Sequence, residues 1–173
     1  MPSLDRAQLR RHVTPTEPTP VQSLELKIPP PIVALIAAVA MWGIKLISPV
    51  VEISSGMRLT TALALALLGG ACAMAGALTF RRAKTTVNPL RPERATSLVS
   101  SGIYRLTRNP MYVGVLAILV AWAVFLAAPL ALIGPAAFAA YITRFQIRPE
   151  ERALSVIFGN EYEGYRSRVR RWL

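Results

Sequence analysis

Residues 31–51 read PIVALIAAVAMWGIKLISPVV, and residues 59–80 read LTTALALALLGGACAMAGALTF. These are apolar runs of 21 and 22 residues. At a rise of 1.5 Å per residue, a helix of this length covers roughly 30 Å, the thickness of the hydrocarbon core of a bilayer. The two runs therefore predict two transmembrane helices and place the chain among membrane proteins.

Two further apolar stretches, 110–128 and 130–147, are separated only by Pro129. This spacing predicts a tight helical hairpin whose two arms are slightly short for a full crossing. Inside hydrocarbon an open sheet edge would leave backbone donors and acceptors unpaired, so helices are expected throughout. The sequence predicts an all-α, polytopic membrane protein with about four transmembrane helices and a cytoplasmic C-terminal helical segment.

The composition of the 173 residues narrows the chemistry. Hydrophobic residues make up 53% and charged residues 17%, and the mean hydropathy is +0.42. The single histidine and the single cysteine, His12 and Cys72, lie far apart, which excludes a disulfide framework, a Cys/His zinc site and a Ser–His–Asp set. We expect no metal, and any chemistry must come from carboxylates, amides, tyrosines, arginines, backbone groups or a bound cofactor.

Charge orients the predicted helices. The chain carries a net charge of +11, of which segment 81–108 contributes +6, segment 144–173 contributes +3 and segment 1–27 contributes +1. With four spans these segments fall on one side, which the positive-inside rule makes cytoplasmic. We therefore expect a plasma or inner membrane protein with its polar site on the cytoplasmic side, and no nucleic-acid partner. The proline-rich, polar segment 1–27 is predicted to be a flexible tail, and 28–173 the membrane domain.

Two polar motifs at the predicted membrane surface each have two interpretations. Asn109 before Pro110 is typical of a helix start, with Asn as N-cap and Pro in the first turn. In one interpretation, the positive end of the helix dipole faces a binding site for an anion. In the other, the motif only caps a membrane helix at the depth of the lipid headgroups. Pro149, Glu150 and Glu151 are likewise typical of a helix first turn, but acids at the end of an apolar span are also functional candidates.

Two further features have structural interpretations. Aromatic residues and arginines recur at helical spacing in 158–172, which favours a basic helix on an anionic membrane surface. Gly69, Gly70 and Gly76 in the second apolar run indicate close packing between helices rather than a phosphate loop.

Five short motifs occur in a recognisable order. They read LVSSGIY at 98–104, RNPMYVG at 108–114, PEE at 149–151, FGNEY at 158–162 and RW at 171–172. This order resembles the isoprenylcysteine carboxyl methyltransferase and phospholipid methyltransferase superfamily of integral membrane enzymes. The resemblance covers about residues 80–173.

The resemblance implies S-adenosylmethionine bound at the cytoplasmic mouth, under the C-terminal segment, with a lipophilic acceptor entering from the bilayer. It implies catalytic candidates at Arg108, Asn109 and Glu150. The family's usual Arg-His-Pro is here Arg-Asn-Pro, and Asn109 can hydrogen-bond a cofactor but takes up no proton at neutral pH. The cofactor contacts implied are Thr96, Ser97, Leu98, Val99, Tyr104, Asn109, Pro110, Met111, Tyr112 and Glu150.

The resemblance also bears on the acceptor. In the isoprenylcysteine enzymes the position matching Gln146 is an arginine that grips the substrate, so Gln146, Arg144 and Arg148 are the substrate-binding candidates. An amide lacks the bidentate, charge-assisted grip that a carboxylate favours, which predicts a different lipophilic acceptor. Two alternatives stay open: a membrane reductase of the sterol reductase type, and a non-enzymatic membrane or lipid-binding protein.

Overall fold

The computed structural model describes residues 25–83 and 97–173. Its described part contains helices and no strands, which confirms the all-α prediction. The elements in chain order are α1 (Pro30–Ile47), α2 (Ser55–Arg82), the 3₁₀ turn η4 (Gly102–Arg105), α3 (Pro110–Leu126), the 3₁₀ turn η5 (Pro129–Leu132), α4 (Ile133–Ile142), the π-helical turn η6 (Thr143–Ile147) and α5 (Arg148–Arg168).

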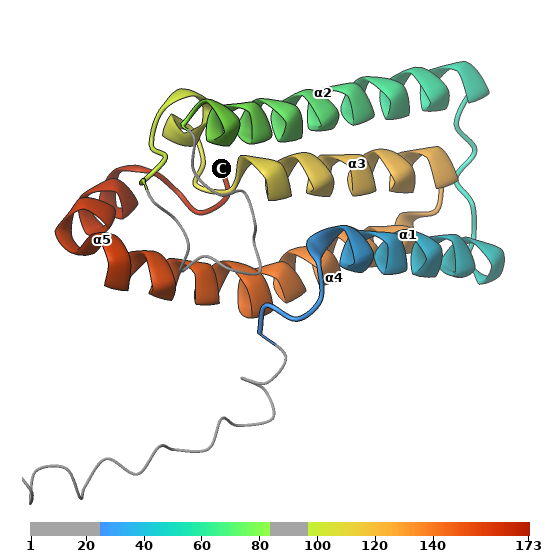
Figure 1. The fold of residues 1–173 in the computed structure, drawn as a ribbon. Helices are drawn as coiled ribbons and strands as arrows, with labels where there is room; N and C mark the ends of the chain where they lie inside the picture. The colour runs from blue at the N-terminus through green and yellow to red at the C-terminus, as the bar shows by residue number, and fades with distance from the viewer. Residues whose placement is uncertain (1–24, 84–96) are drawn as a thin grey trace, which may run out of the picture.

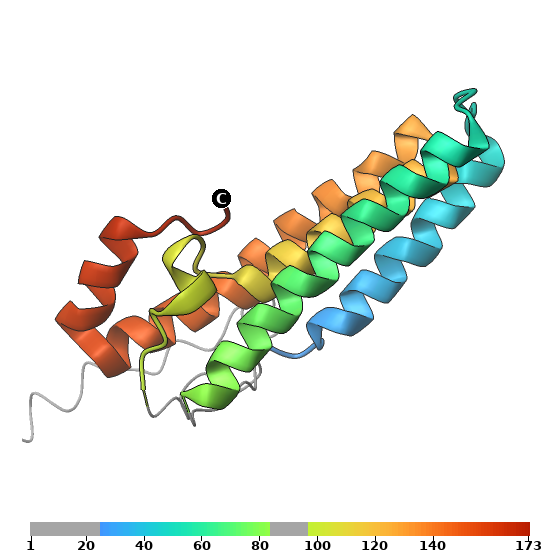
Figure 2. The ribbon, with the colours of Figure 1, turned by 90° about the horizontal axis from the view of Figure 1, so that it is seen from above.

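The four helices α1 to α4 lie side by side in an elongated bundle (Figures 1 and 2). The connections α1–α2 and α3–α4 lie at one end of the bundle, while η4, α5 and the C-terminus gather at the other. The α3–α4 turn is tight, because Ala127 adopts a left-handed conformation with φ of 52° directly before η5. The predicted hairpin around Pro129 is therefore confirmed.

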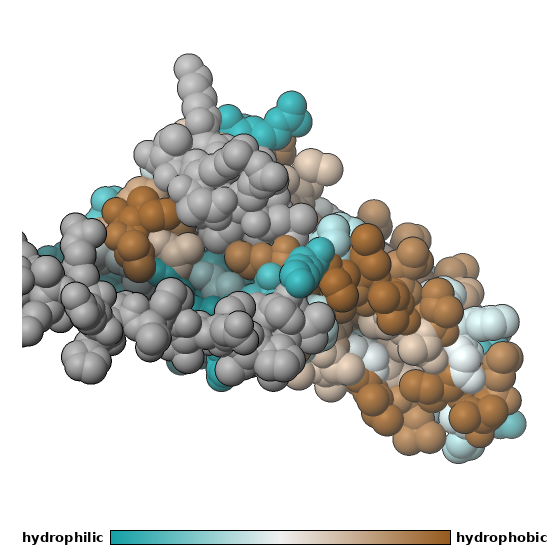
Figure 3. Space-filling model, turned by 60° about the horizontal axis from the view of Figure 1, so that its bottom comes forward, coloured by the Kyte–Doolittle hydropathy of each residue, from teal (hydrophilic) through white to brown (hydrophobic). Residues whose placement is uncertain are grey.

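The helices have the dimensions of membrane spans. Three described segments are long and apolar enough to cross a bilayer: Pro30–Ile47, Ser55–Arg82 and Pro129–Arg168. The fourth bundle helix, α3, is apolar but has only 17 residues. In each of the first two segments, only 11% of the most apolar stretch of 18 residues is buried. Most of their apolar side chains therefore face outward, where lipid accommodates them. Figure 3 shows apolar side chains over one end of the molecule and hydrophilic ones nearer the other.

The bundle core lies between α1, α3 and α4. Met41, Phe138 and Ile142 are almost completely buried there. The Trp122 indole donates a hydrogen bond to the Ala38 carbonyl across 3.1 Å, which links α3 to α1 and satisfies the indole inside an apolar layer. This core holds the helices that carry the polar end in fixed positions.

The helix predicted to begin at Pro149 has no free start: α5 is counted from Arg148, with Pro149 and both acids in its first turn, but it continues directly from the helical turn η6. The chain is helical from Pro129 through Pro149 to Gly159, where non-helical φ and ψ separate a second helical stretch that ends at Arg168. Pro149 lacks an N–H and its ring crowds the preceding turn, and the turn before it widens to a π-helix in which the Arg148 N–H donates to the Thr143 carbonyl. A wider turn relieves such crowding, so the proline is tolerated inside the helix. The helix bends later, at Gly159, where φ is +48°.

Close contact between α2 and α3 depends on glycine. A Cβ on Gly69 would lie 2.6 Å from the Gly114 carbonyl oxygen, and one on Gly76 would lie 2.9 Å from Met111 Cγ. The predicted packing role of these two glycines is confirmed, because neither backbone could approach so closely with a side chain present. Gly70 has no neighbour within 4 Å of its Cβ position, so it plays no part in this contact.

We expect Gly114→Ala to destabilise the bundle by about 1–3 kcal/mol, because its Cβ would meet the backbone of Gly69 and Ala73 and force the helices apart. Gly70→Ala is the matched control and should not lower stability. Thermal unfolding in detergent, followed by circular dichroism, measures both. Equal melting temperatures for the two variants would contradict this packing interpretation.

Candidate functional site

A carboxylate lies between α3 and the long helix at the polar end of the bundle. Tyr112 Oη donates to Glu150 Oε1 across 2.8 Å, and Gln146 Nε2 donates to the same oxygen across 2.8 Å. Tyr112 and Gln146 are buried and Glu150 is partly buried. Gln146 and Glu150 are four residues apart on one face of the helix, whereas Tyr112 comes from the first turn of α3.

The partners of Glu150 are neutral. No arginine or lysine of the described residues forms an ion pair with this carboxylate. The hydrogen bonds from Tyr112 and Gln146 both reach a single oxygen, Oε1. A partly buried carboxylate in such a setting favours a cationic group or hydroxyl donors as its further partner.

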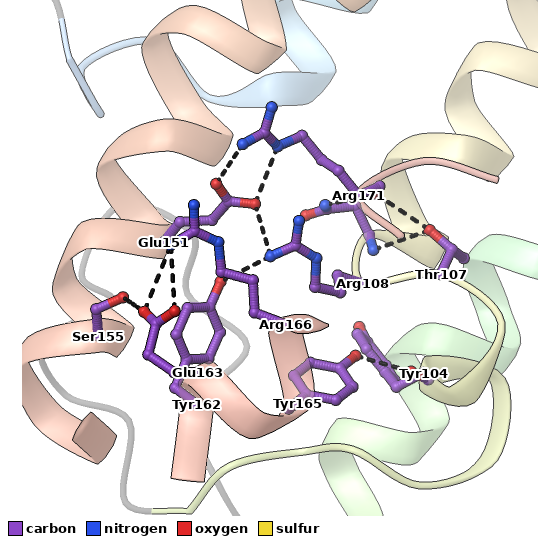
Figure 4. Close-up of polar contacts among 11 residues, drawn as sticks. Tyr104, Thr107, Arg108, Glu151, Ser155, Tyr162, Glu163, Tyr165, Arg166 and Arg171 are labelled. Atoms are coloured by element: carbon purple, nitrogen blue, oxygen red, sulfur yellow. Dashed lines mark hydrogen bonds and ion pairs between the residues drawn. The ribbon is translucent and has the colours of Figure 1, made fainter. Parts of the chain in front are cut away.

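The adjacent acid, Glu151, has different partners (Figure 4). Arg171 binds it with two hydrogen bonds, Nε to Oε1 across 3.0 Å and Nη2 to Oε2 across 2.7 Å. Arg108 Nη1 lies 3.2 Å from Oε1, and the two side chains are only 10% and 12% exposed. Glu150 and Glu151 therefore face different groups, as expected for neighbours about 100° apart on a helix.

The C-terminal segment crosses the start of α3. The Arg108 N–H donates to the Arg170 carbonyl across 2.9 Å, and the Asn109 amide donates to the Arg171 carbonyl across 2.8 Å. Asn109 occupies the N-cap position and Pro110 the first turn, as predicted, but the Asn109 side chain does not cap the helix. That part of the prediction was wrong: the bond from the Asn109 Nδ2 group to the Arg171 carbonyl turns the side chain toward the C-terminal segment, and its Oδ1 accepts no N–H of the first turn.

Trp172 completes this crossing by donating its indole N–H to Thr143 Oγ1 across 3.2 Å. The C-terminal segment is thus tied to α3, to η6 and, through Arg171, to α5. In Figure 1 this segment runs from the end of α5 back to the start of α3.

A cluster of tyrosines lies beside these acids. Tyr104, Tyr162 and Tyr165 are buried together with Val99, and Tyr165 Oη donates to the Tyr104 carbonyl across 2.7 Å. The interpretation of 158–172 as a helix lying only on the membrane surface was therefore wrong for its aromatic face, although Arg166, Arg168 and Arg170 are exposed. Burial raises the pKa of Tyr104, with smaller contributions from Tyr165 and Glu150, so this phenol stays protonated.

Two buried polar atoms near this end have no hydrogen-bond partner within the described chain. They are Ser97 Oγ and Arg108 Nε. Ser97 directly precedes Leu98 and Val99, which pack in the tyrosine cluster, and Arg108 contacts Tyr162 Oη of that cluster across 3.5 Å. Unsatisfied buried groups are costly, so both atoms are candidates for ligand contacts.

The structure brings most residues expected at the cofactor site to this one end. Tyr112, Gln146 and Glu150 form one group, and Leu98, Val99 and Tyr104 form another. Pro110 and Met111 instead pack on Gly76 of α2, and Thr96 lies outside the described residues. Arg144 and Arg148 lie on the outer side of the helix, with Arg148 exposed and Arg144 bound to Glu25. All these site assignments remain predictions.

From the sequence, Glu151 was either an acid of a helix first turn or a functional candidate, and Tyr162, Tyr165 and Arg171 had no individual role. The motifs containing Tyr162 and Arg171 were recognised, but a motif does not say which side chain meets which. The local pattern around Glu151 indicated only a helix first turn. It could not reveal the arginine partners of Glu151, because they are distant in the sequence.

The fold and the site define an integral membrane protein with a cluster of polar side chains at one end of a helical bundle. Residues 57–161 match the phospholipid methyltransferase family, and this chain belongs to that family. The matched region includes Arg108, Tyr112, Gln146, Glu150 and Glu151, but not α1 or the C-terminal segment. Family membership thus covers both acids of the site.

Two relatives are significantly similar. The chain is 46% identical over 63 residues to an uncharacterized protein of Haemophilus influenzae, covering 36% of this chain and all of that protein. It is 34% identical over 110 residues to protein-S-isoprenylcysteine O-methyltransferase B of Arabidopsis thaliana, covering 62% of this chain and 54% of the plant protein. The match thus spans about half the length of the plant relative. No solved structure is significantly similar to this chain.

Proposed function

We propose that this chain is an S-adenosylmethionine-dependent methyltransferase that acts on a lipophilic acceptor. The observation that carries the proposal is Glu150, a carboxylate held by two neutral donors at the polar end of the bundle. Membership in the phospholipid methyltransferase family supports the reaction class.

The residues present fit the cofactor. S-adenosylmethionine supplies a methyl group on a positively charged sulfur, and it also carries ribose hydroxyls and a carboxylate. Glu150 can offset the positive charge or accept from the hydroxyls. The first turn of α3 offers backbone N–H groups without partners inside the helix, which suit a carboxylate. Ser97 Oγ and Arg108 Nε are buried donors available for further contacts.

Methyl transfer from a sulfonium needs no protein nucleophile. The chain's contribution is to align the two reactants and to exclude water, effects worth up to roughly 7–11 kcal/mol in model reactions. Tyr112 and Gln146 fix the position of the Glu150 carboxylate. The C-terminal segment and the tyrosine cluster enclose the same end of the bundle.

Calorimetric titration of the purified full-length protein in detergent tests the proposal. We expect saturable binding of S-adenosylmethionine and none of a reduced nicotinamide cofactor. Binding of the nicotinamide cofactor instead would favour the reductase alternative, and binding of neither would favour a non-enzymatic lipid-binding protein.

We further propose that the site faces the cytoplasm. The two most basic segments, 81–108 with a net charge of +6 and 144–173 with +3, contain or border the site residues, and basic segments favour the cytoplasmic side. Single cysteines introduced at Ser3 and Ser167, in a Cys72→Ser background, should not react with an impermeant thiol reagent added outside intact cells. They should react after the cells are opened. Labelling of either position from outside would overturn this orientation.

The environment of Gln146 bears on the acceptor. Its amide donates to Glu150, so an acceptor carboxylate there would meet a like charge without the arginine grip of the isoprenylcysteine enzymes. We expect a thiol, an amine or another lipid-borne nucleophile. The purified protein should show little carboxyl methylation of a farnesylcysteine analogue, measured by transfer of a radiolabelled methyl group. Robust methylation that Gln146→Ala leaves unchanged would contradict this expectation.

A further inference from the structure

The helix that carries Gln146 and Glu150 on its inner side carries three arginines on its outer side. Arg144, Arg148 and Arg152 are spaced four residues apart, the repeat of one helix face. Arg144 Nη1 lies 2.8 Å from Glu25 Oε1, and Arg152 pairs with the other oxygen of the same carboxylate. We call these three residues the arginine face.

Arg148 stands between the other two and is exposed. It forms no ion pair with any residue of 25–83 or 97–173. The arginine face therefore holds one carboxylate and retains a further guanidinium for another anionic group.

Glu25 belongs to the segment that precedes α1 and is held against the arginine face. The Leu26 N–H donates to the Phe145 carbonyl across 3.1 Å. Leu26 has φ of 57°, a left-handed conformation that costs free energy for a leucine. The ion pairs of Glu25 and the Leu26 hydrogen bond offset that cost, so loss of the ion pairs would leave the segment more weakly held.

The arginine face lies where the apolar part of the long helix gives way to its charged part. Arg144 lies 5.4 Å from the centre of the Phe145 ring, and the rings of Tyr141 and Phe145 are 4.7 Å apart. Aromatic residues beside basic ones at the end of an apolar helix are typical of headgroup depth. Guanidinium groups bind phosphate oxygens with paired hydrogen bonds, as they bind carboxylates.

We propose that the arginine face is a binding site for the phosphate of an anionic phospholipid headgroup, and that Glu25 is its internal competitor. When the lipid phosphate takes the guanidinium groups, the segment around Glu25 loses its ion pairs and is released. Because Gln146 is buried on the inner side of the helix while Arg148 is exposed, this lipid is distinct from the methyl acceptor. Arg144 and Arg148 then leave the set of substrate-binding candidates that the resemblance implies. The proposal does not depend on the methyltransferase assignment.

The test uses the full-length protein in a neutral detergent and a short-chain phosphatidylglycerol as the probe. Short-chain phosphatidylcholine and inorganic phosphate are the comparison ligands, and microscale thermophoresis measures affinity. We expect phosphatidylglycerol to bind more tightly than either. Glu25→Gln should tighten this binding about threefold, and Arg148→Gln should weaken it by a similar factor, as exposed ion pairs typically do.

Arg168→Gln is the matched control, because it removes one exposed arginine beyond the bend at Gly159 that makes no ion pair within the described chain. It should leave the affinity unchanged. An equal loss for Arg168→Gln and Arg148→Gln would overturn the proposal in favour of general charge attraction. Equal affinity for inorganic phosphate would overturn the lipid assignment.

A spin label attached at Lys27→Cys, in a Cys72→Ser background, measures the mobility of the segment around Glu25. Its mobility should rise when phosphatidylglycerol is added and stay constant with phosphatidylcholine. In Glu25→Gln the mobility should already be high without lipid. Lipid binding that leaves the label immobile would contradict the role of Glu25.

Discussion

Glu150→Gln is expected to weaken S-adenosylmethionine binding by roughly tenfold to a hundredfold. The substitution keeps the size of the side chain and removes its charge, and hydrogen bonds to a charged group are worth about 1.5–3 kcal/mol. Tyr112 and Gln146 remain to position the new amide. Calorimetry on the purified variant measures the loss.

Glu163→Gln is the control for this experiment. Glu163 is an exposed acid on the same long helix, paired with Arg166 at the surface, so its loss should leave cofactor affinity unchanged. Tyr104→Phe should weaken binding less than Glu150→Gln. Equal affinity for Glu150→Gln and the unaltered protein would remove Glu150 from the proposed cofactor site.

Glu151→Gln is expected to release the C-terminal segment rather than to act on the cofactor directly. It leaves Arg108 and Arg171 without their shared carboxylate in a mostly buried setting, which should cost about 2–3 kcal/mol of stability. Hydrogen exchange of the amides of 169–173, followed by mass spectrometry, should become much faster. The hydrogen bonds to Glu151 raise the pKa of Arg171. The variant removes this effect, but a guanidinium stays charged at neutral pH without it.

Glu163→Gln again supplies the comparison, because its surface pair with Arg166 is worth at most about 1 kcal/mol. Cofactor affinity should fall less in Glu151→Gln than in Glu150→Gln. Unchanged exchange of 169–173 combined with an equal loss of affinity would show that the two acids act on one ligand and that the C-terminal segment is held by other contacts.

The positions of the main helices could be predicted from the sequence, because hydrophobic length is a property of each segment alone. The predicted spans 31–51 and 59–80 correspond to α1 at Pro30–Ile47 and α2 at Ser55–Arg82. Pro110 at the start of α3 and the turn at Pro129 were also predictable, since proline restricts its own backbone wherever it occurs. The packing role of Gly69 and Gly76 followed from the need for small residues between apolar helices.

The continuity of the helix through Pro149 could not be predicted. Local preferences favour a helix start at a proline followed by two acids, and only the packed bundle makes a π-helical turn at Thr143–Ile147 the better solution. The same turn brings Gln146 inward, where it meets Glu150. The predicted capping role of Asn109 failed for a similar reason, because the Arg171 carbonyl that orients its side chain lies 62 residues away in the sequence.

The sequence by itself thus determined that this chain is an all-helical membrane protein with its charges gathered in a few segments. It also indicated the methyltransferase superfamily, because the short motifs that carry the resemblance are local patterns of the sequence. Only the tertiary structure decided that Glu150 meets Tyr112 while Glu151 meets Arg108 and Arg171. Adjacent acids are chemically identical in a sequence, and their partners lie on other helices or at the chain end. Which partner each acid finds depends on the direction of its side chain on the folded helix, and that direction is set by the packing of the whole bundle.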